Sequence, residues 1–265
     1  DVIHGSYAIA AICVDEPGRV VATRKDSPLI VGIGHDEYFV ASDYPAILKY
    51  ARDIIFPEQG EIVVLNPDGV TVKDEYDNVI NKEVTTINWS PEMAEKGGYD
   101  HFMIKEINEQ DTAIQNTLTQ KENVREIVDE LKDDINRVVF VACGTSYHAS
   151  LIGKYLIEPL AGIPTEVLLA SEFKYSARTL DEKTLVIFIS QSGETADTLK
   201  ALDIANETSK TLAIVNVVGS SMTRRAQYVI QTQAGPEIGV AATKTYVSQL
   251  TAIYLFAGLL SGDEE

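Results

Sequence analysis

The sequence predicts an α/β protein, with an antiparallel α+β piece at the N-terminus followed by a doubly wound parallel sheet. Short β-branched runs joined by tight turns fill the first 90 residues, which is typical of antiparallel strands. From residue 137 onward strand-like and helix-like patterns alternate, which indicates a parallel sheet with helices on its faces. The run at 184–189 is apolar and nearly charge-free, so it is predicted to be a strand buried on both faces.

The composition is typical of a globular protein. The 265 residues are 45% hydrophobic and 23% charged. No apolar run reaches the roughly 20 residues that span a bilayer. The formal net charge of −18 disfavours nucleic acid and anionic membranes as partners, because both are polyanions. The start at Asp1 is neither basic nor Met-led, so we expect no signal peptide and a piece of a longer chain. With only two cysteines, far apart in the sequence, a cytoplasmic location is expected.

Cysteines and histidines are few and widely spaced. Cys13 and Cys143 cannot build a disulfide framework, and the four histidines show no metal-ligand spacing, so we expect no metal. Cys13 lies within an apolar strand and is expected in the core. Cys143 lies between a strand and a helix, a position that can activate a thiol. The sequence places no basic partner beside it, so a structural role is the favoured interpretation.

The first 90 residues are predicted to form short strands with one helix over them. Turns at 15–18 and at 66–69 each join two strands, because Pro, Asp, Asn and Gly favour such reversals. A short helix is expected over 43–51, capped by Ser42 or Asp43. The predicted strands are 5–14, 19–23, 29–33, 38–41, 61–65, 69–73 and 84–87.

Residues 91–136 change to a helical pattern. One helix is predicted over 100–118. A second carries four apolar residues on one face, at i, i+3, i+4 and i+7, namely Val124, Ile127, Val128 and Leu131. The glycine pair at 97–98 is a plausible boundary, since little apolar surface is committed there. The predicted segments are 1–90, 91–136 and 137–262.

Beyond residue 137 the predicted elements alternate. The predicted strands are 138–142, 165–169, 185–189, 212–217 and 228–231. The predicted helices are 146–160, 171–175, 195–207, 221–226 and 243–260. Because such alternation gives parallel strands, the carboxyl ends of all the strands lie at one edge of the sheet.

Two hydroxyl-rich turns follow two of these strands, each at the entry to a helix: Cys143-Gly144-Thr145-Ser146 and Ser190-Gln191-Ser192-Gly193-Glu194-Thr195. Ligands of open α/β sheets bind at this edge. Free N–H groups, a helix dipole and several hydroxyls can hold a phosphate there without a cationic side chain. Neither turn holds Lys or Arg, which argues against a nucleotide P-loop. Ser and Thr before a helix are also ordinary N-caps, and this alternative stays open for each turn.

A third segment, 236–244, lies between the last strand and the last helix. Lys244 could approach an anionic ligand or cap its own helix. Glu237 could act as an acid or base or be a solvated loop charge. The sequence decides neither question.

Five stretches together are distinctive: CGTSYHASLIGKYLIEPLAGIP, ASEFKY, ISQSGETADTL, NVVGSS and GPEIGVAATK. They resemble the first sugar-isomerase (SIS) domain of the glucosamine-6-phosphate synthases, the glutamine–fructose-6-phosphate aminotransferases. The N-terminal GSYAIAAI, VVATRKDSPLIVGIG, YFVASD and PAIL resemble the later half of that family's glutaminase domain, and FMIKEINEQDTAIQNTL resembles the start of its isomerase half. The resemblance covers essentially the whole chain in collinear order.

The resemblance implies a reaction and a site. An Ntn-type glutaminase domain hydrolyses glutamine, and the ammonia converts fructose 6-phosphate to glucosamine 6-phosphate without a cofactor. The family suggests a homodimer. The sugar phosphate is implied to lie against the second turn, and the sugar against the first turn and one loop residue. The implied binding residues are Ser190, Gln191, Ser192 and Thr195 for the phosphate, and Cys143, Gly144, Thr145, Ser146 and Val240 for the sugar.

The departures from the family also carry expectations. The family often has Ser where this chain has Ala242, so a sugar contact there is expected to be lost or replaced by backbone. The family's N-terminal catalytic Cys and the catalytic residues in or after its second SIS domain have no match, so no residue here is assigned to catalysis. We expect the chain to bind fructose 6-phosphate weakly and to turn over neither substrate. The alternative is a stand-alone SIS module that senses a phosphosugar, which the glutaminase-like half and the charge of −18 disfavour.

Overall fold

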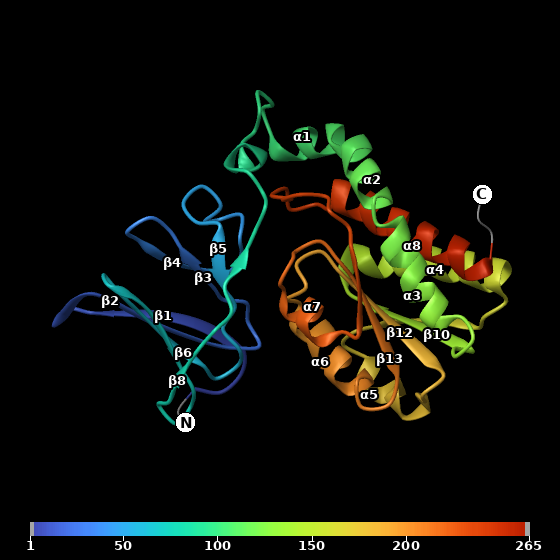
Figure 1. The fold of residues 1–265 in the computed structure, drawn as a ribbon, viewed down its shortest axis with the longest axis horizontal. Helices are drawn as coiled ribbons and strands as arrows, with labels where there is room; N and C mark the ends of the chain where they lie inside the picture. The colour runs from blue at the N-terminus through green and yellow to red at the C-terminus, as the bar shows by residue number, and fades with distance from the viewer. Residues whose placement is uncertain (1–2, 263–265) are drawn as a thin grey trace. The chain divides into compact units, whose positions relative to one another are not determined.

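The computed structural model describes residues 3–262 and divides into two compact units, unit 1 (Asp1–Glu95) and unit 2 (Lys96–Glu265). Figure 1 shows a β-rich unit 1 in blue and cyan and a mixed unit 2 from green to red. Each unit has its own buried apolar clusters. Within the described residues, no helix is both long and apolar enough to cross a bilayer.

Unit 1 consists of two antiparallel sheets, ordered β1-β2-β6-β7-β8 and β4-β3-β5-β9. Residues of both sheets share one buried cluster, so the sheets pack face to face as expected for alternating inward side chains. A 3-10 turn, η1 (Pro91–Ala94), lies near its end. The strands are β1 (Tyr7–Cys13), β2 (Glu16–Lys25), β3 (Ile30–Ile33), β4 (Tyr38–Ala41), β5 (Asp53–Ile55), β6 (Ile62–Asn66), β7 (Gly69–Lys73), β8 (Val79–Ile80) and β9 (Thr85–Thr86).

The predicted hairpin at 66–69 is confirmed, because Asn66 pairs with Gly69 across a two-residue turn. The first turn is displaced from its predicted place, since β2 already begins at Glu16 and the turn falls on residues 14–15. The register shift between Ile12 and Cys13 accommodates this change. Cys13 is exposed, so the prediction of a core cysteine is wrong. Its strand pairs with β2 and lies at the edge of the sheet.

The predicted helix at 43–51 is also wrong, because this segment forms bends and turns. An α-helix needs consecutive i→i+4 bonds, and of the backbone bonds here only that from Ala51 N–H to Ile47 O has this spacing. Three i→i+3 contacts accompany it, including the one that the Asp43 carboxylate accepts from Ala46 N–H. Burial of the segment's apolar side chains against the sheet holds it in this form. Strands β5 and β8 were not predicted.

Unit 2 opens with three helices, α1 (Phe102–Asn108), α2 (Gln110–Leu118) and α3 (Lys121–Leu131). The single helix predicted over 100–118 is therefore two, separated at Glu109. The backbone N–H of Glu109 is shared between the carbonyls of Lys105 and Glu106, which marks the tightened end of a helix. All four residues of the predicted apolar face of α3 are buried, which confirms the period of 3.6.

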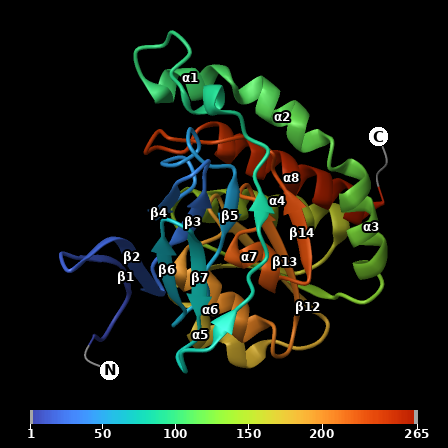
Figure 2. The same ribbon diagram turned by 60° about the vertical axis from the view of Figure 1, so that its left-hand side comes forward.

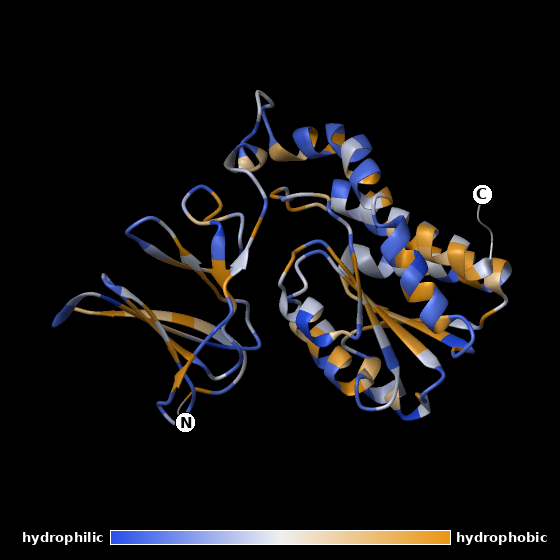
Figure 3. Cartoon of the chain, in the orientation of Figure 1, coloured by the Kyte–Doolittle hydropathy of each residue, from blue (hydrophilic) through white to orange (hydrophobic). Residues whose placement is uncertain are grey.

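The centre of unit 2 is a five-stranded parallel sheet in the order β11-β10-β12-β13-β14. Figure 3 shows its strands as predominantly apolar. Every residue of β12 is buried, as predicted. The strands are β10 (Arg137–Ala142), β11 (Thr165–Leu169), β12 (Thr184–Ser190), β13 (Lys210–Val215) and β14 (Tyr228–Gln231). The doubly wound parallel sheet predicted from the alternation is confirmed.

Helices cover both faces of this sheet (Figure 1; Figure 2 gives the turned view). One buried cluster joins the sheet to α3, α4 and α8, and the other joins it to α5, α6 and α7. Helix α8 also packs against α2. A second 3-10 turn, η2 (Ala177–Thr179), follows α5. The helices are α4 (Gly144–Ala161), α5 (Phe173–Ser176), α6 (Ala196–Ala205), α7 (Ser221–Arg225) and α8 (Lys244–Ser261).

Candidate functional site

The two hydroxyl-rich turns lie side by side at one edge of the parallel sheet. The first strand of the sheet, β10, is flanked by β11 and β12, so the strand order reverses there. Ala142 pairs with Ile189 at the carboxyl ends of β10 and β12. The turn after each strand therefore begins at the same level. The carboxyl edge beside such a reversal is where open α/β sheets bind ligands.

The second turn, Ser190–Thr195, is organised by its own hydroxyls. The Oγ of Ser190 accepts a hydrogen bond from Gly193 N–H at 3.0 Å and lies 3.4 Å from Thr195 Oγ1. The Oγ of Ser192 accepts one from Glu194 N–H at 3.2 Å. Ser190 is only 4% exposed. Since a hydroxyl also carries a proton to donate, Ser192 keeps an O–H for a ligand. Thr195 keeps its own when Ser190 is the donor in their contact.

Helix α7 braces this turn from behind. The Glu194 carboxylate accepts hydrogen bonds from Ser221 N–H at 2.6 Å and from Ser221 Oγ at 2.9 Å. The Gly193 carbonyl accepts one from Met222 N–H at 3.1 Å. Gly193 has φ +68°, and a Cβ there would lie 2.2 Å from Ser220 Oγ. A larger residue at 193 would therefore be strained and would collide with the start of α7.

Asn216 links the same turn to the segment that leads into residues 236–244. Its backbone N–H donates to Gln191 O at 3.3 Å. Its buried side-chain oxygen accepts from Ala234 N–H at 2.8 Å, and its amide nitrogen donates to Gly235 O at 2.7 Å. Sequence reasoning assigned no role to this residue, although it begins the NVVGSS stretch.

The first turn, Cys143–Ser146, is more open. Helix α4 begins at Gly144, two residues before its predicted start, so three of the four residues belong to its first helical turn. Gly144 and Thr145 are exposed, and Cys143 makes no side-chain cap bond. The Cys143 sulfur contacts the Thr198 hydroxyl at 3.9 Å. Backbone N–H groups in a first turn have no intrahelical acceptor, so this turn presents donors at the helix N-terminus.

The two charges left open at 236–244 both have partners within unit 2. The Glu237 carboxylate accepts hydrogen bonds from Thr243 N–H at 2.8 Å and Thr245 N–H at 3.2 Å, so it caps α8. Lys244 is 3% exposed, and its Nζ lies 2.7 Å from Glu109 Oε2. Lys244 therefore forms an ion pair with the α1–α2 junction, and Glu237 is not a solvated loop charge. Val240, between them, is fully exposed.

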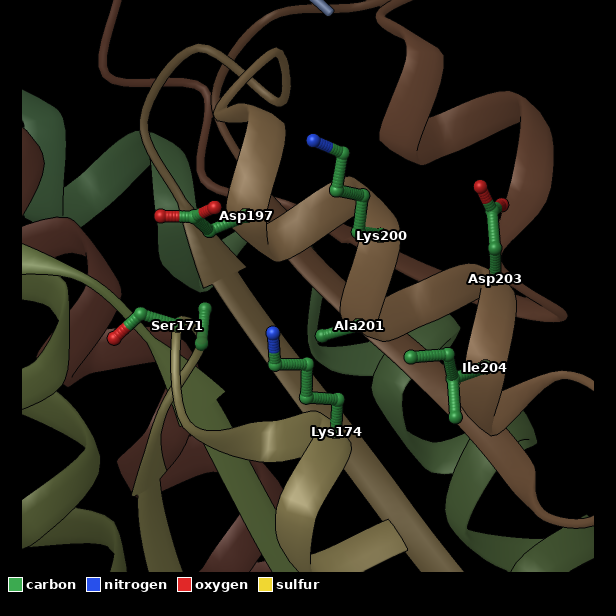
Figure 4. A pocket seen from close by; sticks show the side chains of 8 residues that line it. Ser171, Lys174, Asp197, Lys200, Ala201, Asp203 and Ile204 are labelled. Atoms are coloured by element: carbon green, nitrogen blue, oxygen red, sulfur yellow. The ribbon is translucent and has the colours of Figure 1, made fainter.

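A separate groove of 440 Å³ lies between α5 and α6 (Figure 4). Lys174 and Lys200 extend from its two sides, and Asp203 on its rim is paired with Arg225 at 3.2 Å. The groove is lined by Ala170, Ser171, Lys174, Asp197, Lys200, Ala201, Asp203 and Ile204. This lining contains none of the residues predicted to bind a ligand. Residues 3–262 also contain no group of three or more His, Cys, Asp or Glu side chains that could hold a metal.

Comparison with known proteins identifies relatives of both units. Residues 133–259 match the SIS domain family model. The chain is 60% identical over 262 residues to the glutamine–fructose-6-phosphate aminotransferase [isomerizing] of Methanothermobacter thermautotrophicus, covering 99% of this chain and 44% of the relative. It is 54% identical over 264 residues to the enzyme of the same name from Clostridium perfringens, covering 96% and 43%. The chain thus spans less than half the length of these curated relatives.

Among solved structures, the chain resembles the C-terminal domain of glucosamine-fructose-6-phosphate aminotransferase from Francisella tularensis. The TM-score is 0.60 at 38% sequence identity, over 64% of this chain and 50% of that one. The parallel sheet described above is therefore a SIS fold.

Proposed function

We infer function from one premise, that this chain belongs to the family of the isomerizing glutamine–fructose-6-phosphate aminotransferases. We propose that it serves the glutamine-dependent conversion of fructose 6-phosphate to glucosamine 6-phosphate, the step that commits sugar to amino-sugar synthesis. Its own part is to hold the sugar phosphate. The observation that carries the proposal is the pair of hydroxyl-rich turns at the carboxyl edge beside the strand-order reversal.

The proposal assigns the phosphate to the Ser190–Thr195 turn. Gln191, Ser192 and Thr195 are partly exposed, and Thr195 stands at the N-cap of α6 without a side-chain cap bond. An anion there would meet O–H donors and the positive end of the helix dipole. Ser190, which is nearly buried, would set the shape of the turn and donate its proton to Thr195, which leaves the Thr195 O–H for the phosphate.

The sugar is assigned to the Cys143–Ser146 turn and to Val240. The first turn offers open donors next to the phosphate turn, and hydroxyl groups of a sugar can accept them. Ala242 carries no side-chain hydroxyl, so any contact from that position would come from backbone. No residue of this chain is assigned to proton transfer or to nucleophilic attack.

The remaining assignments rest on the relatives. We propose that residues 1–90 are the C-terminal part of an Ntn-type glutaminase domain, that 91–136 are a helical linker, and that 137–262 are a first SIS domain. Glutamine would be the nitrogen donor of the whole enzyme, and the SIS domains would form a homodimer. Similarity to aminotransferases over 99% of the chain, unit 1 included, favours this function over a stand-alone phosphosugar sensor.

Calorimetric titration with fructose 6-phosphate tests the site. Ser192→Ala and Thr195→Ala each remove one hydrogen bond to a charged group, so we expect the affinity to fall about tenfold for each. Ser171→Ala and Lys174→Ala in the α5–α6 groove are the matched controls and should leave affinity unchanged. A loss of binding in the groove variants instead would place the phosphate there and overturn the assignment.

A further inference from the structure

We propose that Glu106 of α1 positions the sugar-facing loop, so that α1 is a working part of the sugar site. The inference rests on the proposed function, because it concerns the loop that carries Val240. Glu106 lies more than 130 residues before that loop in the sequence. No pattern in the sequence joins the two.

The contact itself is short and buried. The Glu106 carboxylate accepts hydrogen bonds from Ile238 N–H at 2.6 Å and from Gly239 N–H at 3.0 Å. Glu106 is 2% exposed. A Cβ on Gly239 would lie 2.5 Å from Glu106 Oε2, so the close approach depends on glycine at 239. The carboxylate and the loop backbone are therefore fitted to each other.

Two successive backbone N–H groups that point the same way form a concavity that binds anions. Here the chain's own carboxylate fills it. The bonds are charge-assisted, which makes them roughly twice as strong as neutral ones. Because Glu106 occupies this concavity, the concavity is not the site for the sugar phosphate. The role of Glu106 is to fix the loop that lies beside the sugar.

The same helix junction also anchors the far end of the loop. Glu109 lies 2.7 Å from the buried Lys244 Nζ and 3.3 Å from Lys105 Nζ, so one carboxylate serves two ammonium groups. Lys244 is the first residue of α8. Because Lys244 is buried, loss of Glu109 would leave its ammonium group without a partner, which is costly.

The loop is thus held at three points: near its start by Asn216, in its middle by Glu106, and at its end by Glu237 and Lys244. Between the middle and end points, Val240 and Ala241 are exposed. They form the tip of the loop, and its position depends on the hydrogen bonds and the ion pair at these three points. Removing the middle support should move Val240 while the Ser190–Thr195 turn, which Glu106 does not touch, stays in place.

Titrations with two ligands test this. For Glu106→Ala we expect affinity for fructose 6-phosphate to fall about tenfold, the worth of one lost charge-assisted bond, and affinity for inorganic phosphate to change less than about twofold. Glu126→Ala, an exposed acid on α3, is the control and should change neither affinity. Unchanged sugar-phosphate affinity, or equal losses for both ligands, would overturn the inference.

Glu106→Gln provides a second test that survives a folding defect in the alanine variant. The amide keeps the shape and an acceptor oxygen but loses the charge. In amide ¹⁵N–¹H spectra the Ile238 and Gly239 proton signals should move upfield, because a carboxylate acceptor deshields them more than an amide does. Unmoved signals would contradict the contact. This readout needs no ligand, so it still judges the inference if the wild-type chain does not bind fructose 6-phosphate, a result that would overturn the proposed function alone.

Discussion

The two turns at the carboxyl edge of the parallel sheet share a position and differ in construction. The Ser190–Thr195 turn is closed on itself by Ser190 and Ser192 and is tied to α7 through Glu194. The Cys143–Ser146 turn lacks a side-chain cap bond, and its Gly144 and Thr145 are exposed. In the Ser190–Thr195 turn, the Ser190 and Ser192 oxygens accept hydrogen bonds that hold the turn together, whereas the Thr145 hydroxyl of the Cys143–Ser146 turn is exposed.

The difference suggests a division of labour between the turns. A rigid, prebuilt cradle suits a phosphate, whose charge and geometry are the same in every sugar phosphate, because no ordering cost is left to be met on binding. An open turn suits the sugar, whose hydroxyls differ between substrate and product. If this comparison is right, substitutions at the framework residues Gly193 and Glu194 should act mainly on stability, and those in the Cys143–Ser146 turn mainly on binding.

The largest effect is expected from alanine at the two glycines. In Gly193→Ala, strain at φ +68° adds to the collision with Ser220 and Val215, so we expect a loss of about 3 kcal/mol in the free energy of unfolding. Gly144 has φ +56° but open space around its Cβ position, so Gly144→Ala should cost only about 1 kcal/mol. Urea unfolding followed by circular dichroism at 222 nm measures both. Equal losses would show that the turns are supported alike.

Smaller effects are expected from Glu194→Ala, which should lower stability, and from Thr145→Ala, which should weaken binding. Glu194→Ala removes two hydrogen bonds at the start of α7 and should lower the free energy of unfolding by about 2 kcal/mol. Thr145→Ala removes an exposed hydroxyl and should change it by less than about 0.5 kcal/mol.

Titration with fructose 6-phosphate completes this test. Thr145→Ala should weaken binding about tenfold, the worth of one hydrogen bond in the site. If Thr145→Ala destabilised the fold as much as Glu194→Ala, the first turn would be framework as well, and the division of labour would fail.

Sequence reasoning succeeded where a local pattern decides the structure. Continuous β-branched runs marked the buried strands such as β12, and the 3.6-residue period of α3 placed its buried face. Both are properties of neighbouring residues. The edge at which the two turns meet also followed, because it depends only on strand polarity.

Sequence reasoning failed where contacts with residues far away in the sequence decide the local structure. The helix predicted over 100–118 breaks at Glu109, whose carboxylate serves Lys244, 135 residues away. The helical pattern at 43–51 was overridden by packing against a sheet in unit 1. The supports of the candidate site, such as Glu106 and Asn216, were missed for the same reason. Their bonds run to backbone N–H and C=O groups, which leave no trace in side-chain patterns.

The smallest effect is expected at the opposite edge of the sheet, where strands begin and no ligand role is proposed. The Asp181 carboxylate accepts hydrogen bonds from Thr184 Oγ1 at 2.7 Å and from Lys183 N–H at 3.1 Å. The Thr184 bond chiefly, with the backbone bonds, lowers the pKa of Asp181 from its ordinary value of 3.8. Because the folded-state pKa lies below the unfolded one, the ionised group stabilises the fold above about pH 4 and stops doing so as the pH falls through the folded value.

Asp181→Asn should therefore melt slightly below the wild type at pH 7, and the gap should narrow as the pH falls below about 4. Melting temperatures followed by circular dichroism across this range measure the gap, and Glu126→Gln, at an exposed acid of α3, serves as the control. A gap that stays constant with pH would mean that the carboxylate charge is not its cause. Affinity for fructose 6-phosphate at pH 7 should be unchanged, because Asp181 precedes the amino end of β12 and the turns follow the carboxyl ends. A weakened affinity would mean that a change at the amino end of β12 is transmitted along the strand to the turn at its carboxyl end. Binding would then depend on the whole sheet and not on the two turns alone.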